Sequence, residues 1–508
     1  MELQLERTEL AGHDTVVDTT LFSEETLESI VPDACPDILR ILDTDAVVCV
    51  KSREAGEGRA EIRGVLRTSI LYLPDGGQKV CRMEVTLPFV CAADHTAISH
   101  GGMIHAYPRV LSADARMINP RKVYVRVELA MGIRVYMPCR RSLCDHCSCP
   151  REYGVQERRE SCRIYMVTSA QEKHFTFSDD LLLPGSKPDM VDILRQRLEF
   201  CCGESKVIGN KLIFKGQAIL TLLCLSREEQ PMAVAFELPF SQVMEVAGAA
   251  EDAHCDVSIL LNDVSCQLDS EDGRNISVSM DLSAQAVLRE ERSLDVVTDL
   301  YSTGYAMDLQ RKEEQICQLG ERGSRRQSVR EVLETTLGVK SVVDCALVVG
   351  DVLRSWEGSR VDLTADVRVS VLFRGEDDEL YSMDRSLPVT CQWEAEPDSR
   401  CLCWCQCPGE FYATPTLGGV EVRFPLDFFC RTELQNKVDA VCGASLSEDQ
   451  PWDHAQRPSI VLRMVETGES LWEIAKAYAS TQEDIMHANE LADGSALAGK
   501  LLLIPKKR

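Results

Sequence analysis

The chain repeats one β-strand pattern three times, and this repetition constrains its fold more than any other feature. In the first copy, apolar residues occupy alternate positions from Ile62 to Tyr72. The same alternation returns from Phe214 to Cys224 and from Leu363 to Phe373, at a spacing of about 150 residues, long enough for each copy to be a domain. Period-2 alternation is typical of a strand with one buried face. The sequence therefore predicts three similar antiparallel β-domains.

Two further strands and a short helix recur with this pattern. One strand ends in Leu-Pro-Phe at 87–89 and 238–240 and in Leu-Pro-Val at 387–389. The clearest strand covers residues 123–129, 276–282 and 420–426. Before each sheet, apolar residues three and four apart predict a short helix, and proline opens the first two of these segments. The three expected helices cover residues 36–42, 188–194 and 327–333.

The expected fold is mainly β, with three tandem antiparallel β-sandwich or barrel-like domains, each with a short helix, and one small unit at the C-terminus. The 508 residues suit three or four domains at roughly 150 residues each. The predicted organisation is domain one at 1–165, domain two at 166–315, domain three at 316–444, a linker at 445–458 and a last unit at 459–508.

The last fifty or so residues change from strand to helical periodicity. A strand at 460–465 leads to Ser470, and Glu473 three residues later completes a capping-box pattern. Thr481 with Asp484 indicates a second helix start, and a strand at 501–504 closes the unit. The sequence predicts a β-α-α-β arrangement.

This C-terminal unit resembles a LysM domain, through VETGESLWEIAKAYASTQEDIMHANEL and AGKLLLIP. LysM domains bind glycans that contain N-acetylglucosamine, in a groove between the first strand-helix loop and the second helix-strand loop. The resemblance implies that the groove, for a glycan or a protein partner, is formed by Gly468, Glu469, Ser470, Leu471, Asn489, Ala498, Gly499 and Lys500. We expect Trp472 to be a core residue.

The upstream copies resemble the SPOCS domain of spore-coat proteins from endospore-forming Firmicutes. The likeness rests on PDACPDILRIL, GVLRTSILYL and VTLPFV and on their counterparts. It implies a sporulation protein of the mother-cell cytoplasm, placed at the forespore surface in the spore coat. It also implies that the LysM domain docks to the spore-coat morphogenetic ATPase, with other coat proteins as further partners.

Charge and motifs exclude several classes of function. The formal net charge of −26 repels nucleic acid and anionic membranes, so we expect neither as a partner. No run reaches the roughly 18 apolar residues of a membrane-spanning helix, and the opening residues do not resemble a signal peptide. Phosphate-loop, dinucleotide-binding, zinc-protease and serine-hydrolase motifs are absent from the sequence. We expect no enzymatic activity and assign no catalytic residue and no cofactor.

The 23 cysteines include two dense groups, which we expect to lie in loops. Three readings stay open for them: a structural zinc site, thiols without a small-molecule role, and late intermolecular cross-links in a coat. The two groups, as metal candidates, are Cys139, Cys144, Cys147 and Cys149, and Cys401, Cys403, Cys405 and Cys407.

The leading hypothesis is a non-enzymatic scaffold for spore-coat morphogenesis that docks through its LysM domain. The alternative is a protein that binds peptidoglycan in the cell wall or the spore cortex.

Overall fold

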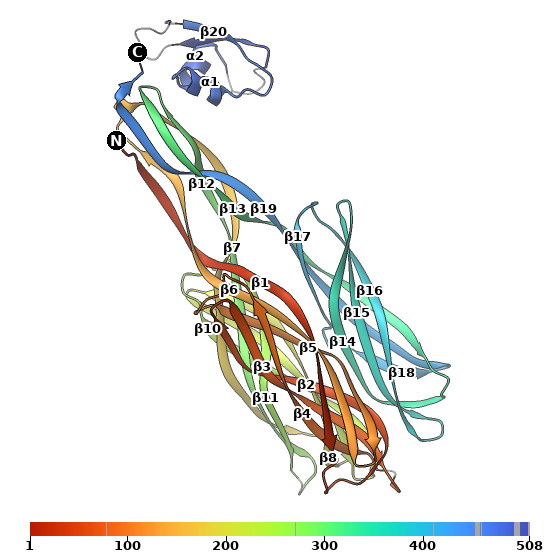
Figure 1. The fold of residues 1–508 in the computed structure, drawn as a ribbon. Coiled ribbons are helices and arrows are strands. Elements are labelled where there is room, and N and C mark those ends of the chain that lie inside the picture. Colours follow the sequence, from red (N-terminus) through yellow and green to blue (C-terminus); the bar gives the residue numbers. More distant parts are fainter. Residues whose placement is uncertain are drawn as a thin grey trace.

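The computed structural model describes residues 1–77, 79–269, 271–409, 411–452, 458, 460–491 and 498–505. Three β-rich repeats are followed by a small helical unit at one end of the molecule (Figure 1). The first repeat contains β1 (Gln4–Ile30), β2 (Ile38–Gly56), β3 (Arg59–Pro74), β4 (Cys81–Asp94), β5 (Met103–Asn119) and β6 (Lys122–Ser148). A 3-10 turn, η1 (Arg151–Tyr153), leads to the second repeat.

The later repeats keep the same order of strands. The second contains β7 (Val155–Leu182), β8 (Met190–Ile208), β9 (Lys211–Ser226), β10 (Pro231–Glu245), β11 (His254–Leu268) and β12 (Asn275–Ser302). The third contains β13 (Tyr305–Glu334), β14 (Val339–Glu357), β15 (Arg360–Gly375), β16 (Leu380–Glu394), β17 (Arg400–Gln406), β18 (Tyr412–Thr416) and β19 (Gly419–Pro451). The last unit contains β20 (Ile460–Met464), α1 (Leu471–Ala477), α2 (Gln482–Ala488) and β21 (Leu501–Pro505).

Each repeat is a sandwich of two antiparallel sheets. The first and last strands of a repeat pair along their length, as β1 does with β6, β7 with β12 and β13 with β19. The three central strands form a second sheet, β2-β3-β4 in the first repeat, and its apolar face packs against the long pair. Alternate residues, such as Ile62, Leu66 and Ile70, are fully buried between the two sheets. The predicted repeated antiparallel β-fold with a small C-terminal unit is confirmed.

The three short helices predicted before the sheets are wrong. Residues 38–42 belong to β2, 190–194 to β8, and 327–333 to β13. The pairing of β2 and β8 shifts register twice near their starts, at Ile38/Arg40 and Ile41/Asp43 in β2. Each β-bulge adds an unpaired residue, so that buried residues fall three or four apart instead of two. The bulges in these strands therefore give the apolar residues the same spacing as on one face of a helix.

The long strands extend beyond the sandwiches as a stalk that carries the C-terminal unit (Figure 1). We define the stalk as residues 4–12, 139–148, 155–166, 290–302, 305–319 and 434–451. Its interior contains apolar side chains from all three repeats. The predicted boundaries at 166, 316 and 445 thus fall inside β7, β13 and β19. Residues 445–447 and 451 of the expected linker pair with β13, and its residues 453–457 lie outside the described residues.

At the level of the sandwiches, the three repeats meet through equivalent positions of β2, β8 and β14. Asp43, Arg195 and Asp344 each follow a register shift in these strands. Arg195 is buried and donates from Nη1 to Asp43 and from Nη2 to Asp344, both at 2.6 Å. Leucines from all three repeats pack in one cluster, which includes Leu42 and Leu194, the residues that precede Asp43 and Arg195. We name Asp43, Arg195 and Asp344 the three-repeat junction.

In the part of the chain that the structure describes, no helix is both long and apolar enough to cross a membrane.

Candidate functional site

The C-terminal unit has the predicted β-α-α-β order, and its helices begin where the sequence indicated. Glu473 N donates to Ser470 Oγ at 3.3 Å, and Ser470 N donates back to the Glu473 carboxylate at 2.9 Å. This reciprocal pair is the predicted capping box, which satisfies two backbone donors at the start of α1. Thr481 caps α2 by accepting from Asp484 N at 3.0 Å.

The structure brings the two predicted groove loops side by side. Val465 N donates to Lys500 O at 3.0 Å, and Gly499 N donates to Val465 O at 2.9 Å. Gly468 and Gly499 have φ angles of +90° and +76°, a left-handed conformation that side chains disfavour. Gly468, Ala498, Gly499 and Lys500 are exposed, and Ser470 is partly exposed. These residues form an accessible pair of loops.

Glu469, in the first of these loops, is bonded to the sheet. Its carboxylate accepts from Arg463 Nη2 at 2.6 Å and from Glu466 N at 3.3 Å. The ion pair with Arg463 ties the loop to β20 and leaves the Glu469 side chain partly buried.

Two residues assigned to the groove instead hold the unit together. Leu471 is only 4% exposed and belongs to the core with Ile474 and Ile485. Asn489 Nδ2 donates to Leu503 O at 2.6 Å, while its Oδ1 accepts from Leu503 N at 2.7 Å. Both side chains are therefore occupied inside the fold.

Trp472 is buried, as expected of a core residue, but part of its burial comes from the stalk. Its ring meets that of Tyr301 in β12 edge-to-face, with centroids 4.8 Å apart. The Tyr301 hydroxyl donates to Ser480 O at 2.9 Å. Trp472 therefore holds the C-terminal unit against the tip of the stalk.

Asp299 of β12 is the polar centre of this contact. Its carboxylate accepts from Trp472 Nε1 at 2.7 Å and from Lys476 Nζ at 2.7 Å, and it forms an ion pair with Arg311. Burial acts to raise the pKa of Asp299, but the hydrogen bonds from Lys476 and Trp472 outweigh it and lower the pKa below its usual value. Asp299, Tyr301, Trp472 and Lys476 are named the stalk contact.

Sequence reasoning missed the stalk contact on the side of β12. Asp299 is one of 81 acidic residues and occupies no recognisable motif. Its partners in the LysM unit, Trp472 and Lys476, lie more than 170 positions away along the chain, so no local pattern marks it.

The first cysteine group lies in and just after a strand, so the expected loop is wrong. Cys139, Cys144 and Cys147 belong to β6, and Cys149 follows its end. Cys144 and Cys147 are buried in the stalk interior. Burial raises the pKa of Cys147 to about 12, so its thiol is protonated at neutral pH.

The second group also lies in a strand instead of a loop. Cys401, Cys403 and Cys405 follow alternate positions of β17, and Cys407 follows directly after it. Cys401 Sγ lies 3.3 Å from Cys430 Sγ in the neighbouring β19. A hydrogen bond with Cys403 lowers the pKa of Cys401, but the contact with Cys430 and burial outweigh it and raise the pKa to about 11.

The cysteine groups do not converge on a common centre. Among the residues that the structure describes, no group of three or more His, Cys, Asp or Glu side chains could hold a metal ion. The zinc reading thus has no geometric support in this structure.

Comparison with protein families identifies two kinds of domain. The SipL, SPOCS domain family matches residues 37–118 and 189–269, which cover β2 to β5 and β8 to β11. The LysM domain family matches residues 464–505. No curated protein and no solved structure matched the chain.

Proposed function

We propose that this spore coat-related protein, with two SPOCS segments and a C-terminal LysM domain, is a non-enzymatic scaffold of the spore coat. In this proposal it works in the mother cell at the forespore surface. Its LysM domain docks to the spore-coat morphogenetic ATPase, and its three sandwiches present surfaces to other coat proteins. SPOCS and LysM are binding or scaffold domains rather than catalytic ones.

The observation that carries this proposal is an exposed apolar face on the LysM sheet. Ile460, Leu462 and Met464 alternate along β20, and Leu501 lies opposite Met464 on β21. All four side chains are more than half exposed, while their neighbours Leu502 and Ile504 face the core. Exposed aliphatic surface of this kind is typical of protein-protein contacts. Sugar recognition in contrast needs polar groups placed for hydrogen bonding.

The stalk contact supports the same role. It covers the α1 side of the LysM unit, through Trp472 and Lys476, and leaves the sheet face uncovered. The unit is thus presented at the tip of the molecule, away from the sandwiches (Figure 1).

The second candidate function is peptidoglycan binding, the usual capacity of a LysM domain. The exposed loops around Gly468 and Lys500 support it, since they are the part of the fold that the family uses for glycans. The two functions use different surfaces, so they are separable by substitution.

A binding experiment with the full chain tests both functions. Purified coat ATPase and purified peptidoglycan sacculi are offered to the wild type, to the sheet-face variant Leu462→Gln with Leu501→Gln, and to the groove variant Lys500→Glu. We expect the sheet-face variant to lose ATPase affinity by at least about tenfold and to keep wild-type behaviour toward sacculi. Leu353→Gln, an equally apolar exposed position on β14, is the matched control.

Two results would contradict the docking proposal. The first is a wild type that binds sacculi but not the ATPase. The second is a sheet-face variant whose ATPase affinity equals that of the Leu353→Gln control.

A further inference from the structure

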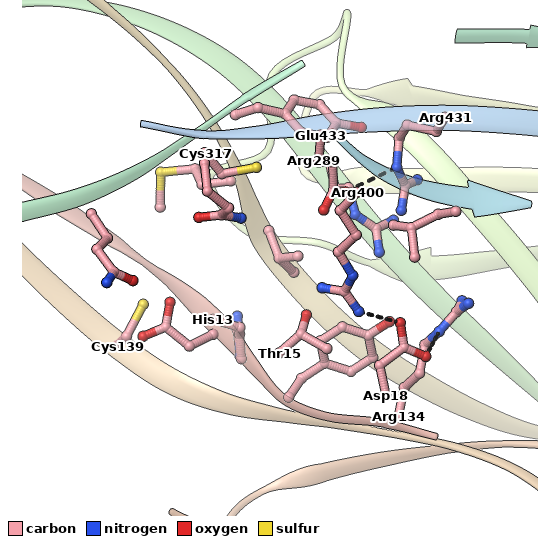
Figure 2. Close-up of a pocket in the computed structure, with 18 of the residues that line it drawn as sticks. His13, Thr15, Asp18, Arg134, Cys139, Arg289, Cys317, Arg400, Arg431 and Glu433 are labelled. Atoms are coloured by element: carbon pink, nitrogen blue, oxygen red, sulfur yellow. Dashed lines mark hydrogen bonds and ion pairs between the residues drawn. The ribbon is translucent and has the colours of Figure 1, made fainter. Parts of the chain in front are cut away.

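A polar cavity of about 340 Å³ lies where the stalk joins the sandwiches. Strands of all three repeats line it, and Figure 2 shows side chains from these strands turned toward one another. Its charged lining is dominated by guanidinium groups, although the chain as a whole carries a net charge of −26. The arginines that line it are Arg134, Arg141, Arg289, Arg400 and Arg431.

Four of these arginines share two carboxylates. Asp18 accepts from Arg134 Nε at 2.9 Å and from Arg400 Nη2 at 2.7 Å (Figure 2). Asp256, which is not a lining residue, accepts from Arg289 Nη1 at 2.6 Å and from Arg431 Nη1 at 3.0 Å. Each aspartate therefore neutralises only one of its two guanidinium partners.

The remaining acids leave the cavity with an excess of positive charge. Glu433 accepts from Arg431 Nε at 3.1 Å, and Asp14 accepts from Arg141 Nη2 at 2.7 Å. With Asp18 and Asp256, four carboxylates thus oppose the five guanidinium groups. The Asp18 cluster, with Arg134 and Arg400, is the part that keeps an unneutralised cation.

Water screens the two sides of the cavity differently, because the side chains of Arg134 and Arg400 in the Asp18 cluster are 30% and 45% exposed, whereas the other pair is buried. Arg289 and Arg431 are 5% and 3% exposed. Like charges repel more strongly in such a low-dielectric setting than at the surface. In addition, within the described ranges, the buried Tyr136 hydroxyl and the His13 Nδ1 atom at this cavity have no hydrogen-bond partner. A bound anion would relieve both the repulsion and the unused donor capacity.

We propose that this cavity binds a small multivalent oxyanion, of the phosphate or polycarboxylate class. The planar fork of arginine donates two parallel hydrogen bonds to such groups, which a halide does not match. The volume lies at the lower end of the range for small-molecule sites and suits an anion of a few heavy atoms. Because all three repeats line the cavity, the anion stabilises their assembly at the base of the stalk. This inference does not depend on how the LysM domain functions.

Calorimetric titration and thermal unfolding of the full chain test the site. The probes are inorganic phosphate and citrate, with sodium chloride at matched ionic strength as the reference. We expect saturable binding and a higher Tm with at least one of the two oxyanions, and whichever binds more tightly identifies the class. Chloride should produce neither effect.

Substitution of a lining arginine makes the test specific. Arg400 is the more exposed of the two arginines paired with Asp18, so Arg400→Gln should fold. It should weaken oxyanion binding by about tenfold or more. Arg400→Lys keeps the positive charge but lacks the planar guanidinium fork. Its affinity for the oxyanion should lie between those of the wild type and Arg400→Gln. Arg116→Gln removes the same charge from an exposed position of β5 and should bind like the wild type. The proposal is overturned if chloride stabilises the protein equally or if Arg400→Gln binds both probes with wild-type affinity.

Discussion

One carboxylate, Asp299, decides how firmly the LysM unit is held on the stalk. It accepts hydrogen bonds from Trp472 and Lys476 and pairs with Arg311, which makes it the shared acceptor of three donors. Hydrogen bonds to a charged group contribute more than neutral ones, on the order of 1.5–3 kcal/mol.

We predict that Asp299→Asn loosens the LysM unit without unfolding it. The amide lacks the negative charge with which Lys476 and Arg311 form ion pairs. The contact between the LysM unit and the stalk should therefore weaken by about 2 kcal/mol. Hydrogen exchange of the α1 peptide, residues 471–477, should become faster. Asp295→Asn makes the same charge change at an exposed position of the same strand and should leave α1 exchange unaltered. Equal exchange in both variants would show that Asp299 does not hold the unit.

The stalk contact should also depend on pH. The folded pKa of Asp299 is lowered, so its contribution to docking is complete above the ordinary aspartate value of about 4. It is lost as the pH falls through the lowered folded value. The difference in unfolding temperature of the LysM unit between wild type and Asp299→Asn should be constant from pH 8 to 5 and shrink below about pH 4. A constant difference down to pH 2 would contradict this prediction.

At the scale of elements, one pair of positions shows how each central sheet is packed. Gly216 lies opposite Phe240, and a Cβ on that glycine would come within 2.5 Å of the Phe240 ring. Gly64 and Phe89 repeat this arrangement in the first repeat. In the third repeat the pair is Ala365 and Val389. Glycine thus faces the large phenylalanine ring, and alanine faces the smaller valine, as expected if the two side chains together fill a fixed space.

We predict that Gly216→Ala destabilises the protein by about 1–3 kcal/mol, because the new methyl group would lie 2.5 Å from the Phe240 ring and 2.9 Å from the Cys201 carbonyl oxygen. Gly216→Ala combined with Phe240→Val recreates the pair of the third repeat. The loss of unfolding free energy in the double variant should therefore be about 1 kcal/mol smaller than the sum of the losses in the two single variants. Denaturant unfolding of the four proteins in this cycle measures the coupling. Strictly additive effects would mean that the ring does not exclude the methyl group.

At the scale of the whole molecule, the three-repeat junction explains how three sandwiches become one body. Equivalent positions carry aspartate in repeats one and three and arginine in repeat two. Arg195 therefore contacts both neighbours at once, and Arg197 adds a bond to Asp344 at 2.8 Å. Burial acts to raise the pKa of Asp344, but the two guanidinium groups outweigh it and lower the pKa.

We predict that Arg195→Met costs about 3–5 kcal/mol, because it leaves buried carboxylates without their shared partner. All three repeats should unfold at a lower denaturant concentration in one transition. Arg227→Met removes an exposed ion pair in the same repeat and should change stability by about 1 kcal/mol or less. Unfolding of the second repeat alone would show that the junction does not couple its neighbours.

Sequence reasoning predicted the features that depend on neighbouring residues. Alternation in Ile62 to Tyr72 located a buried strand, and Ser470 with Glu473 located a helix start. It failed where a bulge altered the spacing, as at residues 36–42, and where a strand continued into the stalk, as at residues 445–451. Of the residues that it assigned to a groove, Gly468, Ala498, Gly499 and Lys500 are exposed, whereas the side chains of Leu471 and Asn489 are occupied inside the fold.

The sequence by itself determined the repeated β-strands, the LysM unit and its helix caps, because each depends on residues within a few positions of one another. Only the tertiary structure decided that Cys144, Cys147 and Cys401 lie buried in strands, that Asp299 holds Trp472, and that arginines of three repeats gather around one cavity. The contacts of Asp299 with Trp472 and of Asp18 with Arg134 and Arg400 join residues more than a hundred positions apart. Their energies depend on burial and charge neighbours that no local pattern records.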